Sequence, residues 1–168
     1  MQRAIVLIGF MGAGKTTVGR ELALLTMWPL FETDHDVEAR FGISVAEIFR
    51  SRGEEEFRAA ESEALAKLPT KRAIIATGGG IVLRPANVAM LKRLGTVVYL
   101  EADEATLLDR LSQDGESRPL LQTDNPRAAL ARLLAEREPL YRAAADFTVN
   151  TTGRSAAEVA QTIVRFVG

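Results

Sequence analysis

Gly9-Phe-Met-Gly-Ala-Gly-Lys15-Thr16 is the stretch of sequence that decides the fold. Its spacing, Gly-x-x-x-x-Gly-Lys-Thr, lets backbone N–H groups turn inward around phosphate oxygens. The apolar run 4–9 predicts a buried strand before it, and residues 15–26 predict a helix after it. This helix would offer its positive N-terminus to the same anions. The segment therefore predicts a nucleotide site, although a glycine-rich turn can match the spacing by accident.

The residue types in this loop also indicate which cofactors to expect. Lys15 is expected to pair with the β and γ phosphates, and the hydroxyl of Thr16 is expected to bind Mg²⁺. ATP and Mg²⁺ are accordingly the expected cofactors. The loop residues expected to hold the nucleotide are Gly12, Ala13, Gly14, Lys15, Thr16 and Thr17.

The bulk properties are those of one globular domain. The chain has 168 residues, enough for a core of its own, and a net charge of −1, which would not attract nucleic acid or an anionic membrane. It has no cysteine, which excludes disulfides and thiol catalysis. The apolar stretch 4–10 is too short to span a bilayer and lacks the features of a signal peptide. We therefore expect a cytoplasmic protein with no nucleic-acid or membrane partner.

Strand and helix patterns alternate along the chain. After the first unit, strands are expected at 29–33, 73–76, 96–100 and 147–149, and helices at 44–49, 54–68, 85–94, 104–111, 126–144 and from 155 onward. The polar segment 112–125 predicts a loop. Such alternation predicts an α/β fold with a mostly parallel sheet covered on both faces. Ligands of such folds gather at the carboxyl ends of the strands.

Two classes of nucleotide-binding protein do not fit. A GTPase would carry the base-reading motif Asn-Lys-x-Asp, which this sequence lacks. A transporter-type ATPase would be longer and would end a second apolar strand in Asp, whereas the strand at 73–76 runs into Thr77 and three glycines. Carboxylates that could assist Mg²⁺ are found instead at the end of the second strand, at Glu32 and Asp34.

The sequence resembles the shikimate kinase family over nearly its whole length. The resemblance is carried by six motifs: Gly-Phe-Met-Gly-Ala-Gly-Lys-Thr-Thr-Val-Gly-Arg at 9–20, Glu-Thr-Asp at 32–34, Gly-Glu-Glu-Glu-Phe-Arg at 53–58, the triple glycine 78–80, Ser-Arg-Pro-Leu-Leu at 117–121 and Arg-Glu-Pro-Leu-Tyr-Arg at 137–142. The phosphate loop alone names only a superfamily. Six motifs in the family's order and spacing are far more specific.

The resemblance implies an architecture and an activity. The architecture is a single P-loop kinase domain, 1–168, with a five-stranded parallel sheet flanked by helices. A substrate-binding helical segment is expected at about 33–61 and a lid at about 112–125. The implied activity is transfer of the γ-phosphoryl group of ATP to the 3-hydroxyl of shikimate, in aromatic amino-acid biosynthesis. A monomer with a small-molecule substrate is expected.

The same resemblance gives roles to residues near the second strand. Asp34 matches the acid that hydrogen-bonds the accepting hydroxyl and takes its proton, and a helix N-cap is the alternative role for it. Glu32 stands where the family has Asp, which organises water around Mg²⁺. Glu keeps the charge but adds a methylene group. His35, the only histidine, and Asp36 are given no part in the reaction.

Several arginines are assigned to ligands. Arg58 and Arg137 match the family's clamp on the substrate carboxylate. Arg137 also lies on an apolar helical stripe, so that it is expected to point inward, where a structural salt bridge or packing along its stem is the alternative. Arg118 is expected to close over the phosphates from the lid, although an arginine in a polar loop is usually solvated. Arg110 and Arg154 match positions near the adenine.

The triple glycine after the third strand is assigned to the substrate, and two other functions fit parts of the same sequence. Gly79 and Gly80 are expected to line the shikimate site, with a bare tight turn as the alternative. A kinase of another small hydroxy acid, such as gluconate, would suit the same two clamp arginines. The second rival is an ATP-binding paralogue without catalytic activity, in which Glu32 would be the first lost residue.

Overall fold

The structure is a computed structural model that describes residues 2–114 and 118–168. Its centre is one parallel sheet of five strands in the order β2-β3-β1-β4-β5. The strands are β1 (Ala4–Ile8), β2 (Leu30–Glu32), β3 (Ile74–Ala76), β4 (Gly95–Glu101) and β5 (Phe147–Asn150). All five lie where the sequence pattern predicts them. Because every strand is parallel, their carboxyl ends meet at one edge of the sheet.

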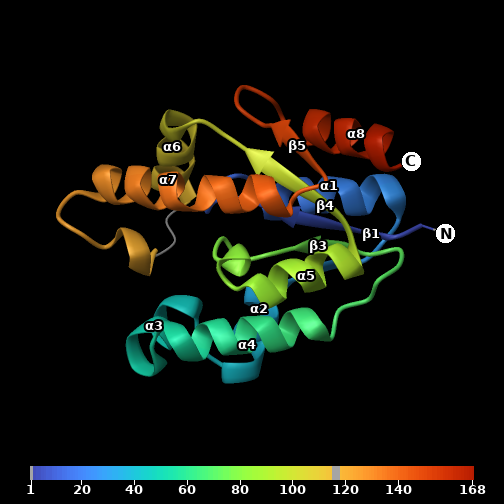
Figure 1. Ribbon diagram of the computed structural model, residues 1–168. Helices are drawn as coiled ribbons and strands as arrows, with labels where there is room; N and C mark the ends of the chain where they lie inside the picture. The colour runs from blue at the N-terminus through green and yellow to red at the C-terminus, as the bar shows by residue number, and fades with distance from the viewer. Residues whose placement is uncertain (1, 115–117) are drawn as a thin grey trace.

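Helices cover both faces of this sheet, as Figure 1 shows. On one face α1 packs against α8, and on the other α5 and α7 lie against β4. The helices are α1 (Lys15–Thr26), α2 (Thr33–Phe41), α3 (Val45–Arg52), α4 (Glu54–Ala66), α5 (Pro85–Leu94), α6 (Glu104–Asp114), α7 (Pro126–Ala144) and α8 (Ala156–Val167), with 3-10 turns η1 (Ile81–Leu83) and η2 (Pro119–Leu121). The predicted three-layer architecture is therefore present.

The core consists of two parts. The central strand β1 is buried along its whole length, as expected for a parallel strand with helices on both faces. Helices α2, α3 and α4 form a separate group at one side of the sheet (Figure 1) and have a small apolar cluster of their own. Its fully or nearly buried members are Val37, Ile48, Phe57 and Ala60. The segment expected at 33–61 is thus packed around its own apolar centre.

Two stretches differ from the expected pattern. Helix α2 occupies residues between the second strand and the first capping serine. The pattern of strands and helices gives no bounds for it, although the resemblance implies a helical segment from about residue 33. Its polar, acidic sequence hides the periodicity, and only Thr33 and Val37 are buried. Helix α6 continues to Asp114, three residues into the segment predicted as a loop. The rest of the expected lid includes residues 115–117, which lie outside the described ranges.

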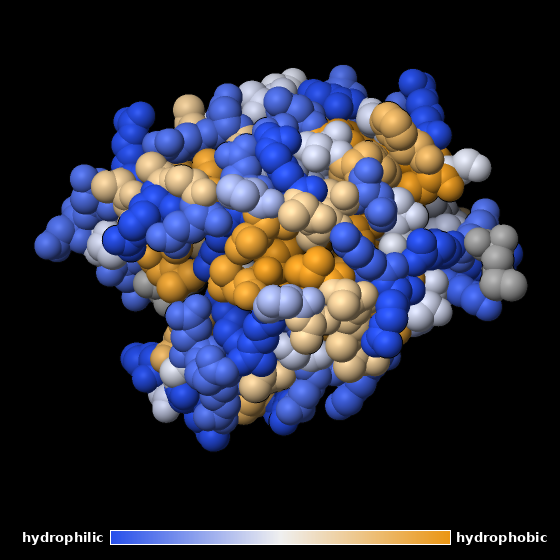
Figure 2. Space-filling model, in the orientation of Figure 1, coloured by the Kyte–Doolittle hydropathy of each residue, from blue (hydrophilic) through white to orange (hydrophobic). Residues whose placement is uncertain are grey.

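One face of the molecule is mostly hydrophilic. Figure 2 shows polar side chains over most of one face, with an apolar area near its centre, where α5 and α7 meet. None of the helices within the described ranges is both long and apolar enough to cross a membrane.

Candidate active site

The loop between β1 and α1 owes its shape to glycines. The φ angle is positive at Gly9 (153°), Gly12 (81°) and Gly14 (94°), where side chains are rarely tolerated. A side chain at Gly9 would also collide with β4, because its Cβ would lie 2.7 Å from the carbonyl oxygen of Leu100. This conformation leaves room for an anion at the N-terminus of α1, as the sequence motif predicts.

Lys15, the first residue of α1, provides the positive charge of this loop. Its Nζ donates to the carbonyl oxygen of Gly9 at 2.6 Å. Burial lowers the pKa of Lys15 to about 8, and the Asp34 carboxylate opposes this effect. The positive charges of Arg118 and Arg137 lower the pKa further. An anion bound among these three cations would relieve their repulsion.

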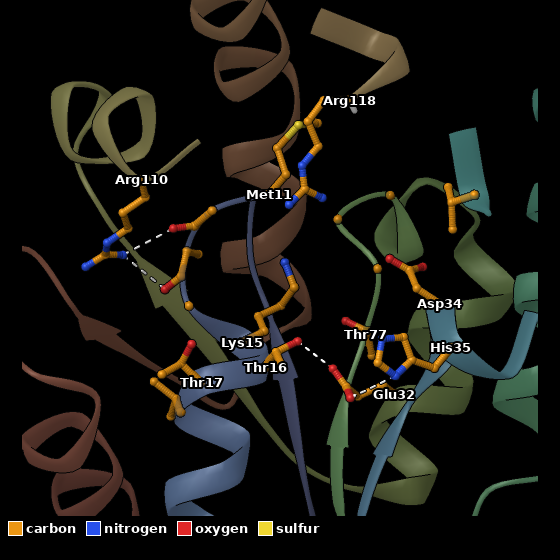
Figure 3. A pocket seen from close by; sticks show the side chains of 18 of the residues that line it. Met11, Lys15, Thr16, Thr17, Glu32, Asp34, His35, Thr77, Arg110 and Arg118 are labelled. Atoms are coloured by element: carbon orange, nitrogen blue, oxygen red, sulfur yellow. Dashed lines mark hydrogen bonds and ion pairs between the residues drawn. The ribbon is translucent and has the colours of Figure 1, made fainter. Parts of the chain in front are cut away.

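A chain of contacts links the loop to the end of β2. The hydroxyl of Thr16 donates to Oε1 of Glu32 at 2.5 Å, and Oε2 of Glu32 lies 3.1 Å from Nδ1 of His35 (Figure 3). The longer side chain of Glu32 therefore does reach the threonine expected to bind Mg²⁺. No role for His35 is predicted from the sequence, yet its ring lies against this carboxylate although the side chain is 65% exposed.

Asp34 lies beyond the carboxyl end of β2, in the first turn of α2. The N-cap of this helix is Glu32, so Asp34 does not act as the helix cap. Burial raises the pKa of Asp34, against the charges of Lys15 and Arg58. Its Oδ1 is buried and has no hydrogen-bond partner among the described residues. In Figure 3 the side chains of Asp34, Lys15 and Arg118 point toward the same space. An oxygen acceptor is thus available there for a hydroxyl group.

Arg58 projects from α4 and is only 7% exposed. Its Nη2 lies 3.3 Å from Oε1 of Glu54, and its Nη1 lies 3.4 Å from Oε2 of Glu61. The guanidinium also lies 5.3 Å from the ring centroid of Phe57, a cation–π distance. Its Nε is buried without a hydrogen-bond partner in the described part of the chain. The group therefore has donor capacity that these long contacts do not use.

Arg137 projects from α7 and is 3% exposed, so the inward direction predicted from its helical stripe is confirmed. Its guanidinium lies 5.9 Å from the ring centroid of Phe10. Among the described residues no carboxylate forms an ion pair with it, unlike Arg58. A structural salt bridge, the alternative considered for Arg137, is therefore not found within the described ranges. A buried guanidinium in this position is well suited to an anionic ligand.

The triple glycine lies between these groups. A Cβ at Gly78 would lie 2.7 Å from both Oδ1 of Asp34 and Oε2 of Glu61, and one at Gly80 would overlap the guanidinium of Arg58. A Cβ at Gly79 would lie 3.6 Å from Nη1 of Arg137. The bare-turn alternative is therefore incomplete, because the absence of side chains is what lets four charged groups approach this loop.

The two arginines expected near the adenine lie at the other end of the site. Arg110 donates to the carbonyl oxygens of Gly12 (3.3 Å) and Ala13 (3.2 Å) (Figure 3). It also donates to Thr151 Oγ1 at 3.2 Å. It thereby connects the phosphate loop to the turn after β5. Arg154 bonds the backbone of its own turn, including the carbonyl oxygen of Asn150 at 3.3 Å.

All residues predicted for the site border one cleft of about 1040 Å³. Its lining includes Gly12, Ala13, Gly14, Lys15, Thr16, Thr17, Glu32, Asp34, Arg58, Gly79, Gly80, Arg110, Arg118, Arg137 and Arg154. This volume is at the upper end of that of ordinary ligand pockets. The cleft therefore has room for a nucleotide and a small second ligand together.

No role is predicted from the sequence for two buried groups of this region. Glu61 is fully buried beside Arg58, and burial raises its pKa to about 7 against the charge of that arginine. It follows Phe57 by four residues, so the helical spacing could have placed it on the inner face of α4. Tyr141 follows Arg137 by four residues and donates its hydroxyl to the carbonyl oxygen of Gly79 at 2.5 Å. The same spacing rule places it beside the clamp arginine.

Comparison with known proteins identifies relatives of the chain. The sequence profile of the family described as shikimate kinase matches residues 11–168. A shikimate kinase of Thioalkalivibrio sulfidiphilus is 48% identical over 163 residues, which cover 96% of this chain and 85% of that protein. The solved structure of the Acinetobacter baumannii shikimate kinase in complex with shikimate is 40% identical. It superposes with a TM-score of 0.94 and covers 99% of this chain and 93% of that one.

A more distant structure shares the fold. A gluconokinase from Sinorhizobium meliloti matches with a TM-score of 0.54 at 20% identity, over 98% of this chain and 90% of that one. At that identity the likeness is one of fold alone. The solved shikimate kinase structure, at 40% identity, shows that the three-layer architecture is the P-loop kinase fold.

Proposed function

Because the chain belongs to the shikimate kinase family, we propose that it transfers the γ-phosphoryl group of ATP to the 3-hydroxyl of shikimate. The products are shikimate 3-phosphate and ADP, in the route to chorismate and the aromatic amino acids. The observation that carries the proposal is the pair of buried arginines, Arg58 and Arg137, which border the same cleft as the phosphate loop. A small carboxylic acid is the ligand that such a pair suits.

The nucleotide half of the cleft is the loop from Gly9 to Thr16. Its inward backbone and Lys15 hold the β and γ phosphates of ATP, while Arg110 and Arg154 border the base. The Thr16 hydroxyl and the Glu32 carboxylate are hard oxygen donors, which fit Mg²⁺, with Glu32 acting through water. Bound Mg²⁺ supplies positive charge against the phosphate oxygens.

The acid half of the cleft fixes the acceptor. Arg58 and Arg137 hold the carboxylate of shikimate, and the N–H groups of Gly79 and Gly80 lie along its ring. Asp34 then accepts a hydrogen bond from the 3-hydroxyl through its buried Oδ1, which has no other described partner. Two anchored ends leave the ring little freedom to turn, so the reacting oxygen stays near the phosphate.

In the transfer itself, the 3-oxygen of shikimate forms a bond to the γ phosphorus as the bond to the β–γ bridging oxygen breaks. Asp34 takes the hydroxyl proton, and ADP leaves with the bridging oxygen. Lys15 and Arg118 stabilise the negative charge of the loose transition state. Closure of the segment 112–125 over the phosphates excludes water, which would otherwise accept the phosphoryl group. The proposal also includes a single domain acting as a cytoplasmic monomer.

A coupled assay of ADP release tests this function. Purified protein with ATP and Mg²⁺ should release ADP many times faster when shikimate is added than in its absence. Gluconate, tested at the same concentration, should give no more than the ATP-only background. If shikimate gives no stimulation in folded protein, the proposal is wrong. Binding of ATP without phosphorylation of either acid would indicate the non-catalytic alternative, and stimulation by gluconate alone would indicate the other kinase.

A further inference from the structure

A tyrosine that the proposed reaction does not use connects the two parts of the acid site. Tyr141 is fully buried on α7, one helical turn after Arg137. Its hydroxyl donates to the carbonyl oxygen of Gly79 at 2.5 Å, across 62 residues of chain. Burial raises the pKa of Tyr141 to about 12, against the charge of Arg137 and a hydrogen bond with it. The hydroxyl therefore stays protonated at neutral pH and contacts both the clamp arginine and the glycine loop.

The tyrosine ring is held in place by the sheet. It stacks on the ring of Tyr99 in β4, with centroids 5.1 Å apart and planes inclined by 25°. Both rings are almost completely buried. Strand β4 pairs with the whole of β1, up to the pair Ile8–Tyr99. The ring of Tyr99, and the ring of Tyr141 stacked on it, are therefore held in a fixed position relative to the phosphate loop that follows β1. A donor fixed in this way can define the position of a flexible partner.

The partner is one peptide group of the glycine loop. The carbonyl of Gly79 and the N–H of Gly80 belong to the same planar, trans peptide unit, so they point in opposite directions. Glycines on both sides of this unit leave it free to rotate at little cost. Fixing the carbonyl on Tyr141 therefore also fixes the direction of the N–H. Gly80 borders the cleft beside Arg58, and no acceptor for its N–H is found among the described residues.

We propose that Tyr141 is a positioning residue of the acid site, which sets the orientation of the Gly79–Gly80 peptide for the substrate. The proposal rests on the proposed function, since it concerns the acid that the kinase binds. It assigns Tyr141 no contact with the reacting atoms. Its absence should therefore weaken capture of the acid and leave the nucleotide half of the cleft unaffected.

Tyr141→Phe tests the role, because it removes one oxygen and keeps the ring stack. Loss of a buried hydrogen bond that leaves a carbonyl oxygen unpaired should raise the KM for shikimate roughly five- to twentyfold. The KM for ATP and kcat should change less than about twofold. A matched control is Tyr99→Phe, which removes the hydroxyl of the other stacked ring. The charged side chains near that ring are Glu101, Glu138 and Arg142, which lie outside the acid site. The KM of the Tyr99→Phe variant for shikimate should equal that of the unchanged protein.

A second variant separates positioning from general packing. A chain carrying para-aminophenylalanine at position 141 retains an N–H donor in the same place and should recover most of the affinity for shikimate. Parallel changes in the two KM values, no change in either, or no recovery with the amino group would overturn the proposal. So would failure of Tyr141→Phe to fold, since the hydroxyl would then be a general requirement of the structure. If the unchanged protein does not phosphorylate shikimate, the proposed function fails instead.

Discussion

The two halves of the cleft are built in different ways. The phosphate half is one continuous loop, Gly9 to Thr16, between a buried strand and the helix that follows it. The acid half is assembled from α2, α4, the glycine loop after β3, and α7. Its parts are joined across long stretches of chain, as by the bond from the Gly78 N–H to Thr33 Oγ1 at 3.0 Å and that from Tyr141 to Gly79. One half is local in sequence and the other depends on the whole fold.

This difference indicates what each half contributes. A loop held by its own glycines and by one helix N-terminus can recur in many kinases, since any phosphate chain fits it. The acid half contains the groups that distinguish one acceptor from another, namely two buried arginines and an aspartate with one buried carboxylate oxygen. Substitutions in the first half should therefore reduce catalysis with any acceptor. Substitutions in the second should change the acid that is bound.

Lys15→Ala should have the largest effect. Removing the one positive charge within the phosphate loop should reduce kcat roughly a hundred- to a thousandfold, the usual cost of losing one group that stabilises transition-state charge. Steady-state rates with both substrates saturating measure this loss. Circular dichroism should show a folded protein. A loss seen mainly in the KM for shikimate would contradict the division into two halves.

Arg137→Ala should come next and should act mainly on the acid. Loss of a buried, charged hydrogen-bond donor should lower kcat/KM for shikimate by about a hundredfold, or about 3 kcal/mol, mostly through KM. Arg142→Ala is the matched control, because Arg142 lies on the same helix in exposed ion pairs with Glu101 and Glu138. A larger change in the KM for ATP than in that for shikimate would show that Arg137 serves the nucleotide instead.

The same contrast explains how much the sequence could predict. The strands follow from short apolar runs, such as residues 4–9, and most helices follow from apolar residues that recur at helical spacing. The phosphate loop follows from its glycines and its strand–helix context. Arg137 could be placed inward because it lies on an apolar stripe of α7. These are local signals, and local reasoning is sufficient for them.

The other features depend on contacts that no local pattern records. The residues next to Arg58 in the sequence suggest an exposed position. It is buried because α4 packs beside the glycine loop. Tyr141 has the right spacing, but its partner Gly79 lies on another segment. Glu61 pairs with Arg58 on its own helix, but its burial comes from the packing of α4 beside the glycine loop. His35 contacts Glu32 only three residues away in sequence, but the connection of this pair to the phosphate loop is made by Thr16 on α1. Contacts between segments that are distant in sequence can be seen only in the folded structure.

Glu61→Gln tests the electrostatics of the acid half through stability. Burial raises the pKa of Glu61 from 4.5 to about 7, so its contribution to stability is complete below about pH 4.5. The free energy of unfolding should fall by up to about 3 kcal/mol as the pH rises from about 4.5 to 7, because over this interval the group is ionised in the unfolded state but still protonated in the folded one. Glutamine should remove this decline, as measured by urea unfolding at pH 5 and pH 8. Glu63→Gln, an exposed change on the same helix, should keep the decline. Equal profiles for all three proteins would contradict the assignment.

Glu32→Asp should have the smallest effect and concerns the border between the two halves. Shortening the side chain should weaken its contact with the Thr16 hydroxyl and with His35. The affinity for Mg²⁺ should stay the same or rise, with changes below about fivefold, since partly exposed charged contacts are worth about 1 kcal/mol or less. Mn²⁺ binding followed by electron paramagnetic resonance, with ATP present, measures this without relying on turnover. Glu38→Asp, the same shortening six residues further along the chain, in α2, is the control. A large loss of metal affinity in Glu32→Asp alone would show that the extra methylene group is a specific adaptation, in which Thr16, Glu32 and His35 act together to hold the metal's water shell.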